Sequence, residues 1–135
     1  MKKQLITVCA FLHQDGKLFT AKRATTKTFL PGKHELPGGH VEYGESLEEG
    51  LIREFEEEFG AEIEVGKLIY AFTYINQVKE SHSVEIVFLA TLKDGATITL
   101  DPTDHSAYAW ISEDEIEQYF DADDNEYQAI KAGFK

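Results

Sequence analysis

Residues 39–61, with the sequence GHVEYGESLEEGLIREFEEEFGA, decide the fold of this chain. Ser46 followed by Glu49 is a capping-box pattern, so we expect a helix from Ser46 to Phe59. At about 100° per residue, its apolar side chains fall on one stripe that must face a core. The members of this stripe are Leu47, Leu51, Ile52, Phe55 and Phe59.

Three carboxylates of the same helix, those of Glu54, Glu57 and Glu58, fall in one sector of about 100° beside the apolar stripe. Like charges at this spacing destabilise a helix, and near its C-terminal end the helix dipole also disfavours anions. A solvated acidic face is the usual explanation of such a run, but Glu49 and Glu56 already supply that face. Because clustered carboxylates suit hard divalent cations such as Mg²⁺ or Mn²⁺, the helix predicts a metal site.

The segments around this helix predict strands. Two runs rich in apolar residues, 5–12 and 17–22, flank Asp15-Gly16 and predict a β-hairpin. A short strand over 34–36 ends at Pro37-Gly38-Gly39, where the backbone could approach a ligand closely. Further strands are expected over 63–77, 84–92 and 98–100, and helices over 112–119 and 124–132. Strands outnumber helices, which indicates a mixed α+β fold in a single domain over 1–135.

Composition limits the function classes. The chain has 135 residues, 42% of them hydrophobic, and a net charge of −12. An acidic surface repels a phosphate backbone, which argues against a long nucleic-acid partner. The single Cys9 cannot form an internal disulfide, and no apolar stretch approaches the roughly 20 residues that cross a membrane. We therefore expect a cytoplasmic monomer or homodimer without a membrane partner, in which Cys9 is a buried apolar residue.

The spacing of Gly39, Glu45 and the run 53–61 resembles the Nudix box of Nudix hydrolases, the family that includes MutT-like nucleotide pyrophosphohydrolases. Every polar and glycine position of the box is filled, whereas Phe55 and Ala61 depart from its aliphatic positions. The resemblance extends to residues 17–23, 35–39 and 104–110, although His34 replaces a frequent tryptophan. It implies an α/β/α sandwich around a mixed sheet, with the box forming a catalytic loop-helix-loop.

The resemblance also implies metal-dependent hydrolysis of a pyrophosphate bond in a nucleoside diphosphate linked to another group. The first substrate class expected is a nucleoside triphosphate, cleaved to monophosphate and pyrophosphate, for example to clear damaged nucleotides. A nucleotide sugar or a dinucleotide is the alternative substrate. In another functional class, the chain would be a catalytically silent regulatory module that binds metal or nucleotide. The complete set of box glutamates argues against that module, because binding alone does not need all of them.

The family roles can be transferred to the matching positions of this sequence. The implied ligands of Mg²⁺ or Mn²⁺ are the carbonyl of Gly38 and the carboxylates of Glu54, Glu57, Glu58 and Asp104. Arg53 and Glu45 would support this site, with Arg53 orienting a glutamate. Glu54, or secondly Glu57, would act as the general base.

Substrate contacts are expected on the basic N-terminal side of the box. Arg23 is the first candidate for phosphate, because a guanidinium binds two phosphate oxygens at once. Gly39 and His40, in the glycine turn, are the other substrate candidates. Solvated surface charge is the simpler explanation of the neighbouring lysines, Lys22, Lys27 and Lys33. Phe72 and Tyr74 could stack on a base or pack in the core.

Overall fold

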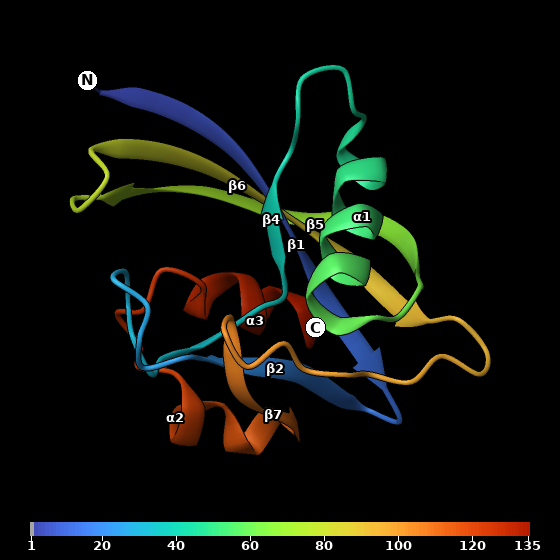
Figure 1. Cartoon of the computed structure of the whole chain (residues 1–135). Helices are drawn as coiled ribbons and strands as arrows, with labels where there is room; N and C mark the ends of the chain where they lie inside the picture. Colours follow the sequence, from blue (N-terminus) through green and yellow to red (C-terminus); the bar gives the residue numbers. More distant parts are fainter. Residues whose placement is uncertain (1) are drawn as a thin grey trace.

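The structure is a computed structural model that describes residues 2–135. Within this range the chain forms a bent mixed sheet with helices on both of its faces (Figure 1). The strands are β1 (Lys3–Gln14), β2 (Lys17–Arg23), β3 (His34–Glu35), β4 (Gly38–His40), β5 (Ile63–Asn76), β6 (Ser81–Leu92) and β7 (His105–Ile111). The helices are α1 (Leu47–Phe59), the 3₁₀ turn η1 (Glu113–Glu115), α2 (Ile116–Tyr119) and α3 (Tyr127–Gly133).

Strand β1 organises the sheet. It pairs in parallel with β6, which in turn pairs antiparallel with β5. On its other edge, Thr7–Cys9 pair with β4, whereas only His13 and Gln14 pair with β2. Strands β3 and β7 flank β2, so the sheet opens into two wings that meet at β1 (Figure 1). The α+β fold expected from the sequence is confirmed.

Several predicted elements are confirmed, but others differ. The Gly38-Gly39 pair, expected to end a strand, belongs to strand β4, and the last helix begins at Tyr127 rather than at residue 124. The hairpin between β1 and β2 turns at Asp15 and Gly16, both with positive φ. Strand β6 begins at Ser81 rather than Val84, because Ser81 and Ser83 pair with residues of β1 and β5 despite their polarity. The strand expected over 98–100 is absent from the sheet that residues 2–135 form. Ile98 and Leu100 instead pack against the core beneath α1, and Thr99 donates a hydrogen bond to the carbonyl of Phe59.

Helix α1 begins and ends as the sequence predicts. The Ser46 hydroxyl accepts a hydrogen bond from the Glu49 backbone, and the Glu49 carboxylate accepts one from the Ser46 backbone. At the other end Gly60 adopts φ 65°, a left-handed conformation that favours glycine. Leu51, Phe55 and Phe59 are fully buried, and each contributes about 1.5–3 kcal/mol by leaving water.

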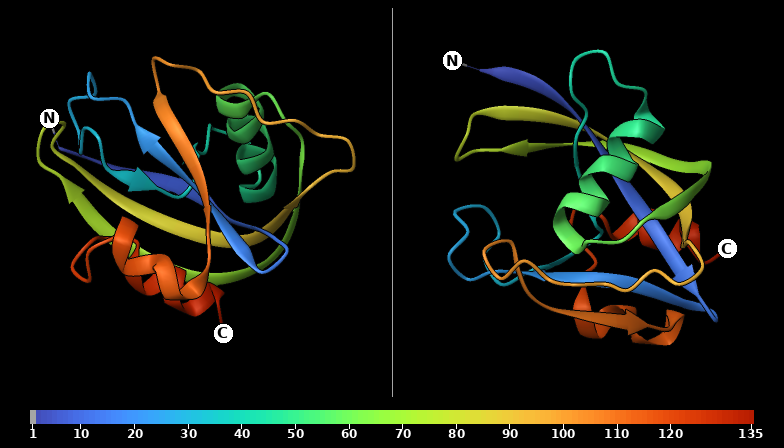
Figure 2. Two further views of the ribbon diagram at one scale, coloured as in Figure 1. Left: turned by 90° about the horizontal axis from the view of Figure 1, so that it is seen from below. Right: turned by 45° about the vertical axis from the view of Figure 1, so that its right-hand side comes forward.

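The two faces of the sheet carry separate cores, which alternate along β1. Val8, Ala10 and Leu12 pack with α1 on one face. Cys9 and Phe11 pack with α3 on the other face, and this confirms the predicted burial of Cys9. Figure 2 shows α1 and α3 on opposite sides of the curved sheet. None of the helices within residues 2–135 is long and apolar enough to span a membrane.

Along β6, the sheet face that α3 covers changes from apolar to polar. Val87 belongs to the apolar core with α3, whereas Glu85, Ser83 and Ser81 are buried polar residues on the same face. They line a cleft together with residues of β1, β4 and β5. The sheet therefore has a polar half on this face, and that half borders the glycine turn of β4.

Candidate active site

Arg53 forms hydrogen bonds with several residues of the predicted box. Its guanidinium makes two hydrogen bonds to the Glu45 carboxylate, at 2.7 and 3.0 Å. A third nitrogen donates to Glu54 at 3.0 Å and to Glu57 at 3.2 Å. The same side chain donates to the carbonyl of His40 at 3.0 Å. Arg53 thus ties helix α1 to the glycine turn, and its hydrogen bonds lower the pKa of Glu45 to about 2.

The glycine turn lies directly against Glu54. A Cβ added at Gly39 would lie 2.3 Å from the carboxyl carbon of Glu54. A Cβ at Gly38 would lie 2.0 Å from the backbone oxygen of Val8. Backbone atoms of β1 thus exclude any side chain at Gly38, whereas a side chain at Gly39 would require the Glu54 side chain to move. Burial raises the pKa of Glu54, which favours proton acceptance near neutral pH.

Glu58 differs from the other two box glutamates. One of its oxygens is buried and has no hydrogen-bond partner within residues 2–135. Burial, with the nearby carboxylates of Glu35 and Glu54 adding to it, raises the pKa of Glu58 to about 9. Without a cation this group favours its protonated form, whereas its ionised form requires a positive charge beside it, and Glu58 therefore fits the role of a metal ligand.

The predicted metal ligands are close but do not all converge. The carboxylates of Glu54 and Glu57 form ion pairs with Arg53, whereas Glu58 lines the cleft together with Gly38. Asp104 is near enough to influence Glu58, and its carboxylate accepts a hydrogen bond from Lys27 at 2.8 Å. Within the described chain, two clusters place three metal-binding atoms within 4.8 Å of one another, and neither contains a box glutamate.

Arg23 lines the same cleft as Glu58 and Gly38. Its Nε donates to the carbonyl of Phe29 at 2.8 Å, and its Nη1 donates to Glu35 at 3.1 Å. The other oxygen of Glu35 lies 2.7 Å from Nε2 of His105. Glu35 therefore holds Arg23 in position beside the candidate metal ligands.

The cleft has a volume of about 190 Å³ and runs from Glu58 to Glu85 along the polar half of the sheet. Lys79 and Arg23 supply its positive charge. Tyr74 lies in the cleft wall and stacks on Phe29, with ring centroids 6.1 Å apart and planes 13° apart. His40 also lines the cleft, and burial together with Lys79 and Lys3 lowers its imidazole pKa.

The remaining sequence candidates have structural partners. Lys33 forms ion pairs with Asp121 and Asp124, and His34 hydrogen-bonds to the hydroxyl of Thr20. Phe72 packs against the core beneath α3, whereas Tyr74 lines the cleft together with Phe29.

Sequence reasoning missed three cleft residues: Glu35, Lys79 and Glu85. Glu85 had a usable signal, since it interrupts the apolar run Val84–Leu89 as a lone charge. Glu35 has no sequence signal of its own beyond its place in the segment that precedes Gly38 and Gly39. Lys79 lies in the turn between β5 and β6, and that position has no local pattern to mark it.

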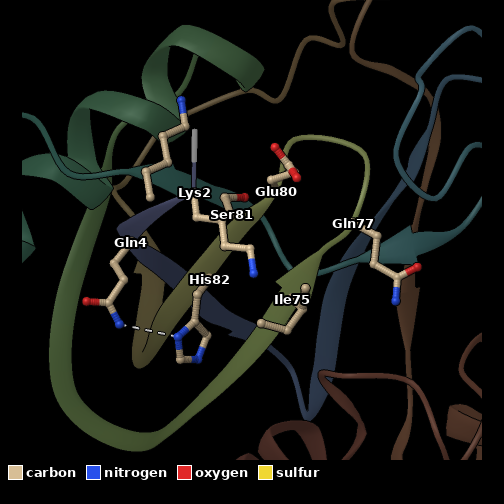
Figure 3. Close-up of a pocket in the computed structure, with 8 residues that line it drawn as sticks. Lys2, Gln4, Ile75, Gln77, Glu80, Ser81 and His82 are labelled. Atoms are coloured by element: carbon tan, nitrogen blue, oxygen red, sulfur yellow. Dashed lines mark hydrogen bonds between the residues drawn. The ribbon is translucent and has the colours of Figure 1, made fainter.

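A larger hollow of about 690 Å³ lies where β1 and β6 begin and β5 ends (Figure 3). Lys2, Glu80 and Ile75 are among its lining residues, and Gln4 hydrogen-bonds to His82 across it at 3.3 Å. It contains no residue of the predicted box. Of the predicted site residues, Glu58, Gly38 and Gly39 line the smaller polar cleft, whereas Arg53 and Glu57 line a separate hollow along α1.

Comparison with known proteins places the whole arrangement in a family. The family model described as the NUDIX domain matches residues 3–132. The nucleoside triphosphatase NudI of Escherichia fergusonii is 27% identical over 125 residues, which cover 87% of this chain and 88% of that protein. NudI of Salmonella newport is 28% identical with the same coverage.

Solved structures agree. The MutT protein from Methanosarcina mazei Go1 has a TM-score of 0.82 at 27% identity, and the match covers 98% of this chain and 94% of that one. The E. coli ORF135 protein has a TM-score of 0.76 at 28% identity, covering 98% and 89%. The similarity therefore extends over nearly the entire chain and includes both wings of the sheet.

Proposed function

The chain belongs to the Nudix family of pyrophosphohydrolases, and we propose that it hydrolyses nucleoside triphosphates to monophosphate and pyrophosphate with the help of a divalent cation. The observation that supports this proposal most directly is the cleft, which is lined by Glu58 of the box, by Arg23 and by the polar half of the sheet. It offers carboxylate for a cation, guanidinium for phosphate and further polar groups for a nucleoside. The activity named for the NudI relatives supports the same substrate class.

The box fits a divalent cation. Glu58 supplies an unpartnered buried oxygen, and Glu54, Glu57, Asp104 and the carbonyl of Gly38 are the other candidate ligands. Oxygen-only ligands of this kind suit Mg²⁺ or Mn²⁺. The chemistry that such a cation supplies when bound is neutralisation of phosphate charge and a lower pKa for a coordinated water.

The chain's own residues have three tasks in this reaction. Arg53 restrains Glu54 and Glu57 through its hydrogen bonds and so limits the movement that would bring their carboxylates to a cation beside Glu58. Glu54 accepts the proton of the attacking water, a role that its raised pKa favours. Arg23, held by Glu35, binds phosphate oxygens and positions the scissile bond.

A panel of nucleoside triphosphates, nucleotide sugars and dinucleotides, each with Mg²⁺ or Mn²⁺, tests the proposal. We expect monophosphate and pyrophosphate from triphosphates, identified by chromatography and a pyrophosphate assay. Release of orthophosphate, or turnover restricted to sugars or dinucleotides, would contradict the substrate class. No turnover of any pyrophosphate compound would instead favour a binding module.

Variants of α1 test the site. Glu57→Gln and Glu58→Gln should lower kcat by at least ~100-fold while the circular-dichroism spectrum is retained. Glu56→Gln is the matched control, because Glu56 is exposed on the same helix but lies outside the sector that carries Glu54, Glu57 and Glu58, and Arg53 bonds to Glu57 instead. Equal activity in all three variants would rule out the box carboxylates as ligands.

A further inference from the structure

Glu35 on β3 joins two side chains that come from other strands. Its Oε1 accepts a hydrogen bond from Nη1 of Arg23 at 3.1 Å, and its Oε2 lies 2.7 Å from Nε2 of His105. Strand β2 lies between β3 and β7, and Arg23 at its end is the pairing partner of His105. The three side chains therefore form a continuous chain of contacts across this wing of the sheet, from His105 through Glu35 to Arg23.

His105 is the most deeply buried member of this chain of contacts. Its side chain is 2% exposed, compared with 25% for Glu35 and 19% for Arg23. Its ring stacks on that of Phe59, with centroids 5.1 Å apart and planes 26° apart. Phe59 is the last residue of α1 and is itself fully buried. Packing therefore holds the imidazole in one place beside the helix that carries the box.

The two ring nitrogens of His105 differ in their partners. A carboxylate only accepts hydrogen bonds, so Nε2 carries the hydrogen that is donated to Glu35. Nδ1 is buried and has no hydrogen-bond partner within residues 2–135. An unpartnered buried polar atom costs stability, and an apolar side chain of similar size would avoid this cost. The hydrogen bond to Glu35 is the contact of His105 that such an apolar side chain could not make.

Arg23 is held by several contacts that leave one of its nitrogens out. Nε donates to the carbonyl of Phe29 at 2.8 Å, and the guanidinium lies over the Phe29 ring, 5.8 Å from its centroid. Nη1 donates to Glu35, whereas Nη2 takes part in none of these contacts. Arg23 lines the cleft together with Glu58. Contacts of this kind fix the plane of the guanidinium, and with it the direction from which a phosphate oxygen can be bound.

Pyrophosphate hydrolysis requires that phosphate binding and the box carboxylates keep a fixed relative position. A displacement of about 1 Å in such an arrangement can cost about 100-fold in rate. His105 contacts both sides of this arrangement, Glu35 by its hydrogen bond and Phe59 of α1 by stacking. A buried rigid ring at this place can therefore set the position of Arg23 relative to α1.

We propose that His105 is a positioning residue for phosphate binding, which acts through Glu35 to orient Arg23 relative to the box helix. This inference rests on the proposed function, because it takes Arg23 as the residue that binds substrate phosphate. It assigns a role in the reaction to a buried residue that does not itself line the cleft.

His105→Gln and His105→Met separate the hydrogen bond from the packing. Both new side chains are unbranched and similar in length, but only glutamine has an N–H that can donate to Glu35. We expect His105→Met to raise KM for nucleoside triphosphates and to lower kcat/KM by at least ~10-fold, and His105→Gln to stay within ~3-fold of the wild type. The melting temperature of His105→Met should nevertheless be at least that of His105→Gln, because methionine buries no polar group.

A role in packing alone gives a different pattern. It would make the two variants equal in kcat/KM, and a loss of folded protein would lower kcat without changing KM. Either result would overturn the inference. Ser106→Ala is the control for β7, since Ser106 is exposed and follows His105 directly, and this variant should match the wild type.

A double-mutant cycle tests whether His105 acts through Arg23. Arg23→Met should itself lower kcat/KM, and the addition of His105→Met should lower it by no more than a further ~2-fold, because no guanidinium remains to be oriented. Losses that multiply in the double variant would show that His105 acts independently of Arg23, and would overturn the inference.

Binding without turnover separates this inference from the proposed function. Isothermal titration calorimetry with the α,β-methylene analogues of ATP, GTP, CTP and UTP, each with Mg²⁺, measures nucleotide binding when the α,β bond cannot be hydrolysed. We expect Kd to rise by at least ~10-fold in His105→Met and by less than ~3-fold in His105→Gln. If the wild type hydrolyses no triphosphate, the proposed function fails. The inference about His105 fails if no analogue binds or if both variants have the Kd of the wild type.

Discussion

At the scale of single residues, Arg53 explains how several acids coexist on one short stretch of chain. Its guanidinium binds Glu45 through two nitrogens and also reaches Glu54 and Glu57. The ordering of box carboxylates is therefore built into the folded protein rather than left to substrate. An Arg53→Lys substitution keeps the charge but loses the planar group that makes these contacts simultaneously.

The Glu45–Arg53 pair predicts a specific acid sensitivity. The pKa of Glu45 falls from its usual 4.5 to about 2, chiefly through hydrogen bonds from Arg53. A lowered pKa means that the unfolded chain binds the proton more readily, so this pair stabilises the fold above pH 4.5 and loses its effect as the pH falls towards 2. Glu45→Gln should therefore lower the melting temperature at pH 7, with the deficit shrinking towards pH 2–3. Melting curves of the wild type and Glu45→Gln across this range test the prediction.

The exposed Glu56 provides the comparison for that experiment. Glu56→Gln should leave the melting temperature within ~1 °C of the wild type at every pH, because surface substitutions rarely exceed about 0.5 kcal/mol. A Glu45→Gln deficit that stays constant with pH would show that the loss comes from packing rather than from charge.

At the scale of elements, the two glycines of β4 should have different roles: Gly38 should matter for stability and Gly39 for activity. A Cβ at Gly38 would meet the backbone of β1 at Val8, which cannot move without disturbing the sheet. A Cβ at Gly39 would meet the Glu54 side chain, which can rotate away. We expect Gly38→Ala to lower the melting temperature by ~5 °C or more, and Gly39→Ala to retain most stability but lose at least ~10-fold in kcat.

Melting curves and steady-state kinetics of both variants separate these effects. Gly44→Ala is an unsuitable control because Gly44 has φ 89°, where alanine is strained whatever the space. Gly50→Ala is not neutral either, because its Cβ would lie 3.2 Å from Oε1 of Glu45, the partner of Arg53. Full activity in Gly39→Ala would show that displacing Glu54 does not impair the reaction.

The packing of helix α3 on β1 should contribute to the stability of the fold. A Cβ at Gly133 would lie 2.2 Å from the ring of Phe11, which is buried beneath this helix. Gly133→Ala should therefore force α3 away from β1 at a cost of about 1–3 kcal/mol, measured by urea unfolding. Unchanged unfolding would mean that Phe11 relaxes without moving the helix.

At the scale of the whole molecule, local patterns predicted the elements but not the long-range contacts. The capping box and apolar stripe placed α1 to within a residue, and the Asp15-Gly16 turn placed the first hairpin. The strand expected over 98–100 was wrong, because alternating apolar residues can pack on a helix without pairing in a sheet. Period-two alternation alone does not distinguish these cases.

The far end of the cleft shows why the site was only partly predictable. Glu35, Glu85 and Glu126 lie far apart in sequence and come together because β6 pairs in parallel with β1 and α3 returns across the sheet. Their convergence depends on strand order, which no local pattern encodes. The box glutamates were predictable because one helix carries them all.

The acidic segment 101–126, which sequence alone left without a role beyond Asp104, has several separate uses. Asp121 and Asp124 pair with Lys33, and Asp101 accepts hydrogen bonds from Thr103 in a turn. Glu126 accepts a hydrogen bond from the backbone of Leu36 and lines a second cavity next to the cleft. Much of the acidic segment therefore makes separate local contacts rather than forming one acidic surface.

The same charge distribution predicts how a divalent cation changes stability. Glu58 is buried beside other carboxylates, and a cation that binds only the folded chain would remove that repulsion. At a concentration of about 100 times Kd, such binding adds about 2.7 kcal/mol to the free energy of unfolding. We therefore expect millimolar Mg²⁺ or Mn²⁺ to raise the melting temperature, measured by differential scanning calorimetry against EDTA.

General screening of a highly acidic protein would also raise the melting temperature, so the cation must be compared with NaCl at equal ionic strength. Specific binding requires a larger rise with the divalent cation, its loss in Glu58→Gln and its retention in Glu56→Gln. Equal effects of NaCl and the divalent cation would show that screening alone acts, and that the cation reaches the box only with the nucleotide. A full divalent effect in Glu58→Gln would place the cation elsewhere, because the variant removes the negative charge at the unpartnered buried oxygen of Glu58.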